Sequence, residues 1–362
     1  MVGPYAESSR ALILARIDMT QEFKSAEFYS RQTVLPELGP NGQQKLRASV
    51  VTVIGLGGLG SVSTIFLSLA GVGSLKLVDQ DTVEMKNLHR QPLYSLTDLR
   101  HPKVDVATRR LSELNPETKV EPIAENLESR NIASIISDTD CVVDGLDNME
   151  TRYLINRYCV EKRIPYVFGG AIGMEGNVAV FKSPETACLE CVMPGLKDAD
   201  LPTCETRGIL GATAGIVGAI QALEAIKVLT GIEPESTGKL MLFDFAQSEF
   251  RTIDLRIRLD CEVCQKKTAT LASFPRRIAW LCGSNTANVN PEEPVSLDLT
   301  SLSKDLARDH TVLLATSSVV VFDYRGHEVS LFRKGRMLIK NVRDEEEALE
   351  VFRAVERLIC AG

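Results

Sequence analysis

Residues 49–60 read SVVTVIGLGGLG, and this stretch decides the fold. Its first half is a short run of β-branched apolar residues, which is typical of a strand buried on both faces of a parallel sheet. Its second half places four glycines between that strand and a following helix: Gly55, Gly57, Gly58 and Gly60. Glycines at such a turn let the backbone approach a nucleotide, and the helix N-terminus offers free N–H groups. The stretch therefore predicts a nucleotide-binding turn.

Strands and helices alternate on the C-terminal side of this turn. Strands are expected at 75–79, 119–122 and 141–145, and helices at 103–114 and 132–136. This alternation predicts βαβ units in an open, doubly wound, mostly parallel α/β sheet with its ligand crevice at the carboxyl ends of the strands. A hairpin pattern follows, so we expect the sheet to turn antiparallel at 166–181.

The chain is longer than one hydrophobic core usually spans, so more than one domain is expected in its 362 residues. We divide it into an N-terminal extension (1–26), a main domain with a long crossover loop at 192–211 (27–284), a linker rich in Asn, Pro and Glu (285–294) and a small α+β domain (295–362).

Composition and charge argue against nucleic-acid and membrane partners. The sequence is 44% apolar and 25% charged with a formal net charge of −7, so it offers no broad basic surface. We expect no apolar run that approaches the roughly 20 residues needed to cross a bilayer, and the first 37 residues lack the apolar core of a secretory signal. A cytoplasmic protein is therefore predicted.

Four of the nine cysteines fall into two C-x-x-C pairs. They are Cys188 with Cys191 and Cys261 with Cys264. Two such pairs predict a closed, tetrahedral Zn²⁺ site that staples the fold and does no chemistry. A redox motif would need only one pair, and unrelated free thiols are the remaining alternative.

Charged residues after the second strand suggest which nucleotide is bound. Asp79 ends that strand, where a carboxylate hydrogen-bonds ribose hydroxyls, so an NAD-dependent oxidoreductase fits this residue as well as an ATP-binding enzyme does. Arg90 and Lys103 follow, and two cations suit a triphosphate because they stabilise the charge of leaving pyrophosphate. Solvated surface charges are the plainer alternative for each.

Several short motifs then occur in order between residues 27 and 264. They are YSRQ at 29–32, the glycine turn, NLHRQ at 87–91, PKV at 102–104, DGLDN at 144–148, the two C-x-x-C pairs and GAIQALEAIK at 218–227. In these motifs the chain resembles the MoeB and ThiF adenylyltransferases, the single-chain relatives of the ubiquitin-activating enzymes. The resemblance implies a Rossmann-like domain that uses ATP and Mg²⁺ to adenylate the C-terminal glycine of a ubiquitin-like β-grasp protein.

The resemblance also implies roles for individual side chains. Asp79 would hold the ribose, and the phosphates would be lined by Asn87, Arg90, Gln91 and Lys103. Asp147 would hold the Mg²⁺ that bridges phosphate oxygens, while its position just before a helix also fits an N-cap.

Two further residues have roles that reach beyond the nucleotide pocket. The resemblance implies that Arg31 comes from the partner subunit of a homodimer and reaches the γ-phosphate. Cys204 lies in the crossover loop near Arg207, where an exposed thiol beside a cation is placed to act as a nucleophile. In the family the matching cysteine takes the acyl group or exchanges sulfur, although some members adenylate without it.

The fate of the activated protein stays open at this stage. Transfer to a conjugating enzyme and receipt of sulfur from a donor both fit. A fused rhodanese domain is disfavoured because the only cysteine after Cys282 is Cys360, two residues from the end. The small C-terminal domain fits a recruiting role and a dimerisation or stability role equally well, and a catalytically silent scaffold subunit remains a third class.

Overall fold

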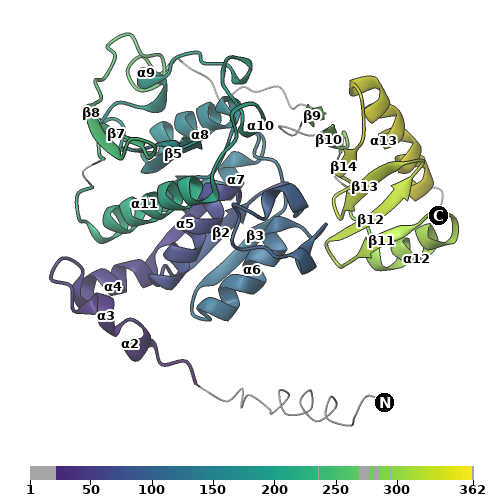
Figure 1. The fold of residues 1–362 in the computed structure, drawn as a ribbon, viewed down its shortest axis with the longest axis horizontal. Coiled ribbons are helices and arrows are strands. Elements are labelled where there is room, and N and C mark those ends of the chain that lie inside the picture. Colours follow the sequence, from purple (N-terminus) through teal and green to yellow (C-terminus); the bar gives the residue numbers. More distant parts are fainter. Residues whose placement is uncertain (1–21, 235, 269–277, 281–284, 294, 361–362) are drawn as a thin grey trace, which may run out of the picture.

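Two β-sheets organise the chain (Figure 1). The computed structural model describes residues 22–234, 236–268, 278–280, 285–293 and 295–360. Residues 1–21 of the expected N-terminal extension lie outside this description.

The larger sheet has the strand order β3-β2-β1-β4-β5-β6-β7-β8. Its strands are β1 (Val50–Ile54), β2 (Ser74–Val78), β3 (Lys119–Ile123), β4 (Cys141–Asp144), β5 (Tyr166–Ile172), β6 (Glu175–Phe181), β7 (Lys239–Asp244) and β8 (Glu249–Asp254). Strands β1 to β5 run parallel, and β6, β7 and β8 extend the sheet with antiparallel pairings. The predicted doubly wound, mostly parallel sheet is confirmed, and its order reverses between β1 and β4, where ligands bind in such sheets.

Both faces of this sheet are covered. Val53 and Ile54 are neighbours on β1 but belong to different hydrophobic cores, because alternate side chains of a strand point to opposite faces. The core around Val53 includes residues of α5 (Gly58–Leu69), α6 (Lys103–Leu114) and α11 (Gly211–Thr230). The core around Ile54 includes residues of α7 (Ile132–Ile136) and α8 (Met149–Lys162).

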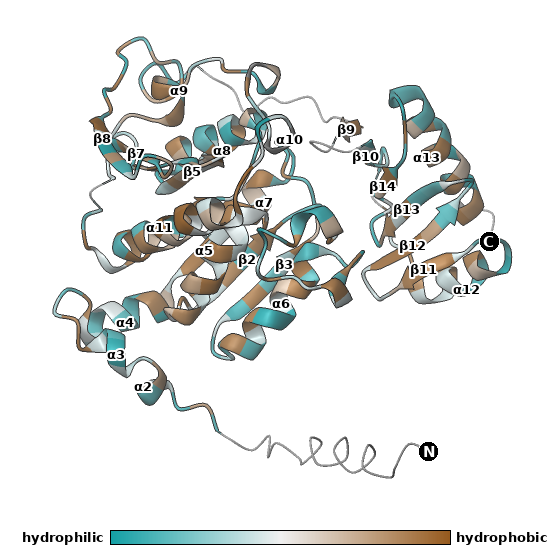
Figure 2. Cartoon of the chain, viewed as in Figure 1, coloured by the Kyte–Doolittle hydropathy of each residue, from teal (hydrophilic) through white to brown (hydrophobic). Residues whose placement is uncertain are grey.

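Helix α11 corrects one expectation from the sequence. It is the one helix in the described residues that is long and apolar enough to span a membrane by length and composition, so the view that no apolar run approaches this length was wrong. In the structure α11 packs against α5, β5 and β6, and Figure 2 shows both helices largely hydrophobic within the larger domain. Burial in the core therefore explains part of its apolar composition, while Ile216 and Leu223 on the same helix are exposed.

Shorter elements complete this part of the chain. They are α2 (Ser25–Phe28), α3 (Ser30–Thr33), α4 (Gly39–Ala48), η1 (Met85–Asn87), η2 (Leu96–Asp98), α9 (Leu189–Val192), η3 (Asp198–Asp200) and α10 (Cys204–Arg207). The segment 192–211 is thus a long connection, as expected, with two short helical pieces inside it.

The second sheet is antiparallel with the order β11-β12-β13-β14-β10-β9. Its strands are β9 (Ile278–Trp280), β10 (Thr286–Val289), β11 (Val312–Ala315), β12 (Val319–Tyr324), β13 (His327–Phe332) and β14 (Met337–Lys340). Helices α12 (Leu299–Asp309) and α13 (Glu345–Cys360) contribute to its core. We call the described residues from Ile278 to Cys360 the C-terminal module.

The prediction of a linker at 285–294 was wrong, because strand β10 lies within this range. All four residues of β10 are buried, and the strand pairs with β14 on one side and β9 on the other. The Asn-rich sequence reads as a linker because polar side chains are uncommon inside a sheet. Here the side chain of Asn288 is hydrogen-bonded to Gln80 and Arg336, so its burial is compensated.

Candidate active site

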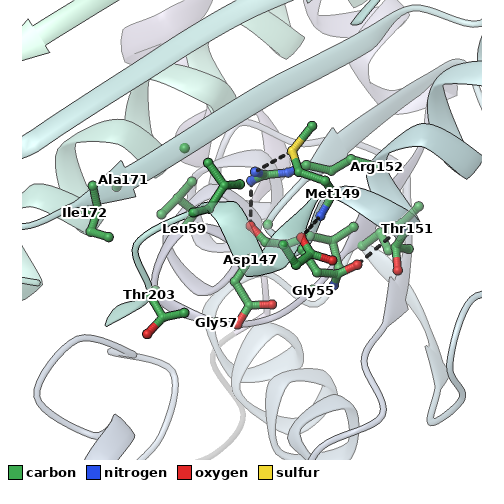
Figure 3. A pocket seen from close by; sticks show the side chains of 18 of the residues that line it. Gly55, Gly57, Leu59, Asp147, Met149, Thr151, Arg152, Ala171, Ile172 and Thr203 are labelled. Carbon is green, nitrogen blue, oxygen red and sulfur yellow. Dashed lines mark hydrogen bonds between the residues drawn. The ribbon is translucent and has the colours of Figure 1, made fainter. Parts of the chain in front are cut away.

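A cavity of about 1630 Å³ opens at the carboxyl ends of the parallel strands (Figure 3). It collects most of the side chains and turns that the sequence singled out. Those that line it are Gly55, Gly57, Gly58, Asp79, Asn87, Arg90, Gln91, Lys103 and Asp147. Residues from three separate βα connections, those that follow β1, β2 and β4, therefore meet in one space.

The glycine turn has two kinds of glycine. A Cβ atom on Gly60 would lie 1.8 Å from the carbonyl oxygen of Gly55, so Gly60 permits close packing of the turn on α5. It does not line the cavity. A Cβ atom on Gly57 would meet nothing closer than 3.8 Å, so this position borders open space and leaves room for a ligand beside the backbone.

Asp79 is fixed at the end of β2 by two backbone N–H groups. Its Oδ2 accepts from Leu56 at 2.7 Å, and its Oδ1 accepts from Asp81 at 2.7 Å. Burial raises the pKa of Asp79, and the charge of Lys103 opposes that shift. The carboxylate therefore joins the glycine turn to the loop 79–81, which we call the ribose loop after its predicted role.

Lys103 is a buried cation at the start of α6. Its Nζ lies 2.9 Å from Oδ2 of Asp81, and the side chain is 4% exposed. Burial lowers the pKa of Lys103, but the carboxylates of Asp79 and Asp81 outweigh it, so the net shift is upward and the ammonium stays charged. Solvated surface charge, the plainer alternative for this residue, does not apply.

Arg90 is held in place by neighbours on its own loop. Its Nη2 donates to Oδ1 of Asn87 at 2.8 Å, and its Nη1 donates to the carbonyl of Lys86 at 3.0 Å. Gln91 is buried beside it. These contacts fix Arg90 at the wall of the cavity, where its guanidinium charge suits a polyanionic ligand.

Asp147 is exposed and borders the cavity just after β4 (Figure 3). The N-cap of α8 is the next residue, Asn148, whose side chain accepts from the backbone of Thr151 at 3.0 Å. The capping explanation for Asp147 is therefore excluded. Its carboxylate is available to a cation in the cavity, and oxygen ligands of this kind suit Mg²⁺.

A buried ion pair behind Asp147 was not predicted. Nε of Arg152 donates to Oδ2 of Asp144 at 2.9 Å, and the hydroxyl of Tyr166 donates to the same oxygen at 2.6 Å. Arg152 also donates to the carbonyls of Leu146 and Gly169. The group fixes the turn that carries Asp147. Asp144 stood in the DGLDN motif, but its partners are distant in sequence, so only the fold brings them together.

The four cysteines of the C-x-x-C pairs converge on one point. Their sulfur atoms all lie within 4.8 Å of one another, and the closest pairs are separated by 3.4 to 3.8 Å. A tetrahedral ion with Zn–S bonds of about 2.3 Å requires sulfurs about 3.8 Å apart, so the tetrad fits zinc. Burial first, and then the neighbouring thiols, raise the pKa of Cys188, which a bound cation would reverse.

Arg31 does not line the cavity of its own chain in the described structure. Arg31 is exposed on α3, in the N-terminal segment. Cys204 is the first residue of α10, and its side chain lies outside the described part of the structure. The residues just before it, from Leu201 to Thr203, line the cavity. Arg207, the cation expected near the thiol, is ion-paired with Glu175.

The geometry defines a nucleotide-binding α/β protein with a separate cysteine staple. The family is shown by the sequence: a model of the ThiF family matches residues 29–263, and the chain belongs to that family. Among solved structures it resembles the crystal structure of MccB from E. coli, with a TM-score of 0.60 and 24% identity over 67% of this chain and 74% of that one. This likeness supports the fold.

Curated relatives share more of the sequence. The chain is 40% identical to the sulfur carrier protein ThiS adenylyltransferase of Escherichia coli, covering 65% of this chain and 94% of that protein. It is 38% identical to the SAMP-activating enzyme E1 of Haloferax volcanii, covering 65% and 87%. It is 42% identical to the adenylyltransferase and sulfurtransferase MOCS3 of Culex quinquefasciatus, covering 65% and 54%, so it spans about half the length of that relative.

Proposed function

We propose that this chain is an adenylyltransferase that uses ATP to activate the C-terminal carboxylate of a ubiquitin-like sulfur-carrier protein. The observation that carries the proposal is the single cavity that joins the cationic group at Arg90 and Lys103 to the crossover segment before Cys204. Its volume exceeds the roughly 300–1,000 Å³ of an ordinary small-molecule site, which suits a nucleotide together with an extended peptide tail. Relatives named for ThiS and SAMP activation support this substrate class.

The proposed first step is an in-line displacement at the α-phosphate of ATP. A carboxylate oxygen of the carrier forms a new bond to the α-phosphorus while the bond to the bridging oxygen of pyrophosphate breaks. Arg90 and Lys103 stabilise the charge that develops on the phosphates, and no general base is needed because the nucleophile is already ionised. Asp147 would hold Mg²⁺, which neutralises phosphate charge when bound.

The proposed second step is attack on the acyl-adenylate by sulfur, with release of AMP. The nucleophile is either the thiolate of Cys204 or an external sulfur donor. A thioester on Cys204 would pass the carrier toward a conjugating enzyme, whereas attack by hydrosulfide supplied by a donor would displace AMP and leave the carrier as a thiocarboxylate. The relatives named for sulfur carriers favour the second outcome. The cysteine tetrad would hold zinc as a structural ion, and we place the reaction in the cytoplasm.

The experiment that tests this function is exchange of labelled pyrophosphate into ATP by the full chain. We expect exchange only when a ubiquitin-like protein with a free C-terminal glycine is added, and none with the same protein lacking that glycine. Intact mass measurement then distinguishes a thioester on the enzyme from a thiocarboxylate on the carrier. Failure of exchange with every carrier tried, despite ATP binding, would instead support a silent scaffold subunit.

A homodimer with Arg31 acting in trans is part of the proposal. Arg31 is exposed and does not line the cavity of its own subunit, which is consistent with a place in the partner's site. Arg31→Ala and Asp147→Ala should each lower exchange by at least about 100-fold. Unfolded and refolded together in equal amounts, they should regain about a quarter of wild-type activity, because half the dimers then hold one intact site.

The alternative arrangement, with Arg31 acting in its own subunit, predicts a different result. If Arg31 acts within its own subunit, no mixed dimer contains an intact site and the mixture stays inactive. Each variant unfolded and refolded alone is the matched control for refolding.

A further inference from the structure

The C-terminal module is attached to the rim of the nucleotide cavity. Four of its polar contacts end on residues that line the cavity. They are Asn288 Nδ2 to Gln80 Oε1 at 2.8 Å, Asn290 Nδ2 to Glu128 Oε1 at 3.2 Å, Lys340 Nζ to Glu84 Oε1 at 3.1 Å and Lys334 Nζ to Glu125 Oε1 at 2.5 Å. A fifth contact, between Arg100 and Glu328, lies beside them.

The module also supplies part of the cavity wall. Residues of β9, β10 and β14 face the same space as the glycine turn, among them Trp280, Thr286, Leu338 and Lys340. They line it together with the residues that follow β2 and β3. The phosphate-binding turn follows β1 and the ribose loop follows β2, so the space beyond β3 lies farthest from the phosphates and closest to the base of a nucleotide.

Arg336 connects the module to the ribose loop. Its guanidinium lies over the ring of Phe332 at 3.6 Å, and its Nη1 donates to Oδ1 of Asn288 at 3.1 Å. Asn288 in turn donates to Gln80, which stands between Asp79 and Asp81. A continuous chain of hydrogen bonds therefore runs from the core of the module into the ribose loop.

The surroundings of Arg336 are unusual for an arginine. The residue is 4% exposed, and in the described residues its Nη2 has no hydrogen-bond partner. Oδ1 of Asp81 is likewise buried without a partner there. Burial lowers the pKa of Arg336 to about 10, and the charges of Asp81 and Asp79 oppose that shift. A buried cation is costly unless nearby carboxylates compensate it, so its position is tied to the charge of the ribose loop.

We propose that the C-terminal module closes the base and ribose end of the nucleotide cavity, and that Arg336, acting through Asn288, is a positioning residue for the ribose loop. This inference rests on the proposed ATP-dependent function. The proposed phosphate-binding residues belong to the ThiF-family domain. The contacts described for the module reach other residues of that domain: the ribose loop, Glu84 and the segment that follows β3. Loss of the module should therefore weaken nucleotide binding and leave the rate at saturating ATP nearly unchanged.

The experiment uses the full chain and two ligands, AMP and pyrophosphate, each of which represents one end of ATP. Trp280 is the chain's single tryptophan and lines the cavity, so its fluorescence reports nucleotide binding without any carrier. Arg336→Gln should weaken AMP binding and raise the KM for ATP by about tenfold. Pyrophosphate affinity, measured by calorimetry, and kcat of carrier-dependent exchange should stay within about twofold.

Two further variants serve as a control and as an alternative test. Arg333→Gln is the matched control, because this exposed arginine of the same module donates to the carbonyl of Ser317 and has no hydrogen bond or ion pair to a cavity residue among those described. It should leave all four quantities unchanged. Lys340→Gln covers the case in which Arg336→Gln does not fold, since it removes the link to Glu84 from a partly exposed position and should show the same loss confined to AMP and ATP.

Each outcome bears on one proposal. Unchanged AMP affinity in the folded variants, or equal losses for AMP and pyrophosphate, would overturn the role of the module. If Trp280 responds to ATP and the response depends on Arg336, but no carrier supports exchange, the module's role stands and the proposed reaction fails.

Discussion

Asp147→Ala is expected to lower carrier-dependent pyrophosphate exchange by about 1,000-fold while the melting temperature stays within about 2 °C. The side chain is exposed and caps no helix, so its removal costs the fold little. It borders the cavity, and its charge acts on both Lys103 and Arg152, so it lies near the cation that we propose to bind the phosphates. Loss of a group that holds Mg²⁺ at the reacting phosphate removes transition-state stabilisation of about 4 kcal/mol.

A control on α8, the helix that follows Asp147, separates this effect from a general loss of acidic charge. Glu161→Ala removes a carboxylate near the other end of α8 that pairs only with its neighbour Lys162 among the described contacts, and it should keep full activity. Asp147→Asn should behave like Asp147→Ala, because the amide keeps the shape but loses the charge. Exchange that is undiminished in either Asp147 variant would refute the assignment.

The local parts of the fold could be predicted from the sequence because each carries its own pattern. Helices α6 and α7 have the expected bounds, and β1 begins one residue later than expected. A continuous β-branched run that leads into glycines has few structural alternatives. The site residues that line the cavity follow from this, since residues just after parallel strands meet at one edge of the sheet.

Features that depend on distant partners could not be predicted. Asn288 belongs to a segment whose composition predicts a linker. In the structure it is buried within β10, because Gln80 and Arg336 form hydrogen bonds with its side chain. Arg152 carries no motif that marks it in the sequence, and it is buried in the structure because Asp144 compensates its charge. In each case a polar residue interrupts the local sequence pattern. The contacts that allow it to be buried form only when the chain folds.

The second prediction with a large effect concerns the four-cysteine zinc site and is tested with Cys261→Ser. We expect the wild-type chain to hold about one zinc ion and the variant to hold none, with a melting temperature lower by about 10 °C. The tetrad joins two segments separated by 73 positions, and its cysteines form a small buried cluster whose apolar neighbours are few, so the ion must supply much of the local stability. Metal analysis and thermal unfolding measure both quantities.

Cys159→Ser is the matched control for this change. Cys159 and Cys261 are each 3% exposed, so both substitutions bury a hydroxyl in place of a thiol, but Cys159 lies in the core around α8, away from the tetrad. The control should lose some stability and keep its zinc, because desolvation affects both sites and metal ligation only one. Exchange activity in Cys261→Ser should fall only in proportion to the unfolded fraction. A wild-type chain that purifies without zinc, or a serine variant that retains it, would contradict the staple.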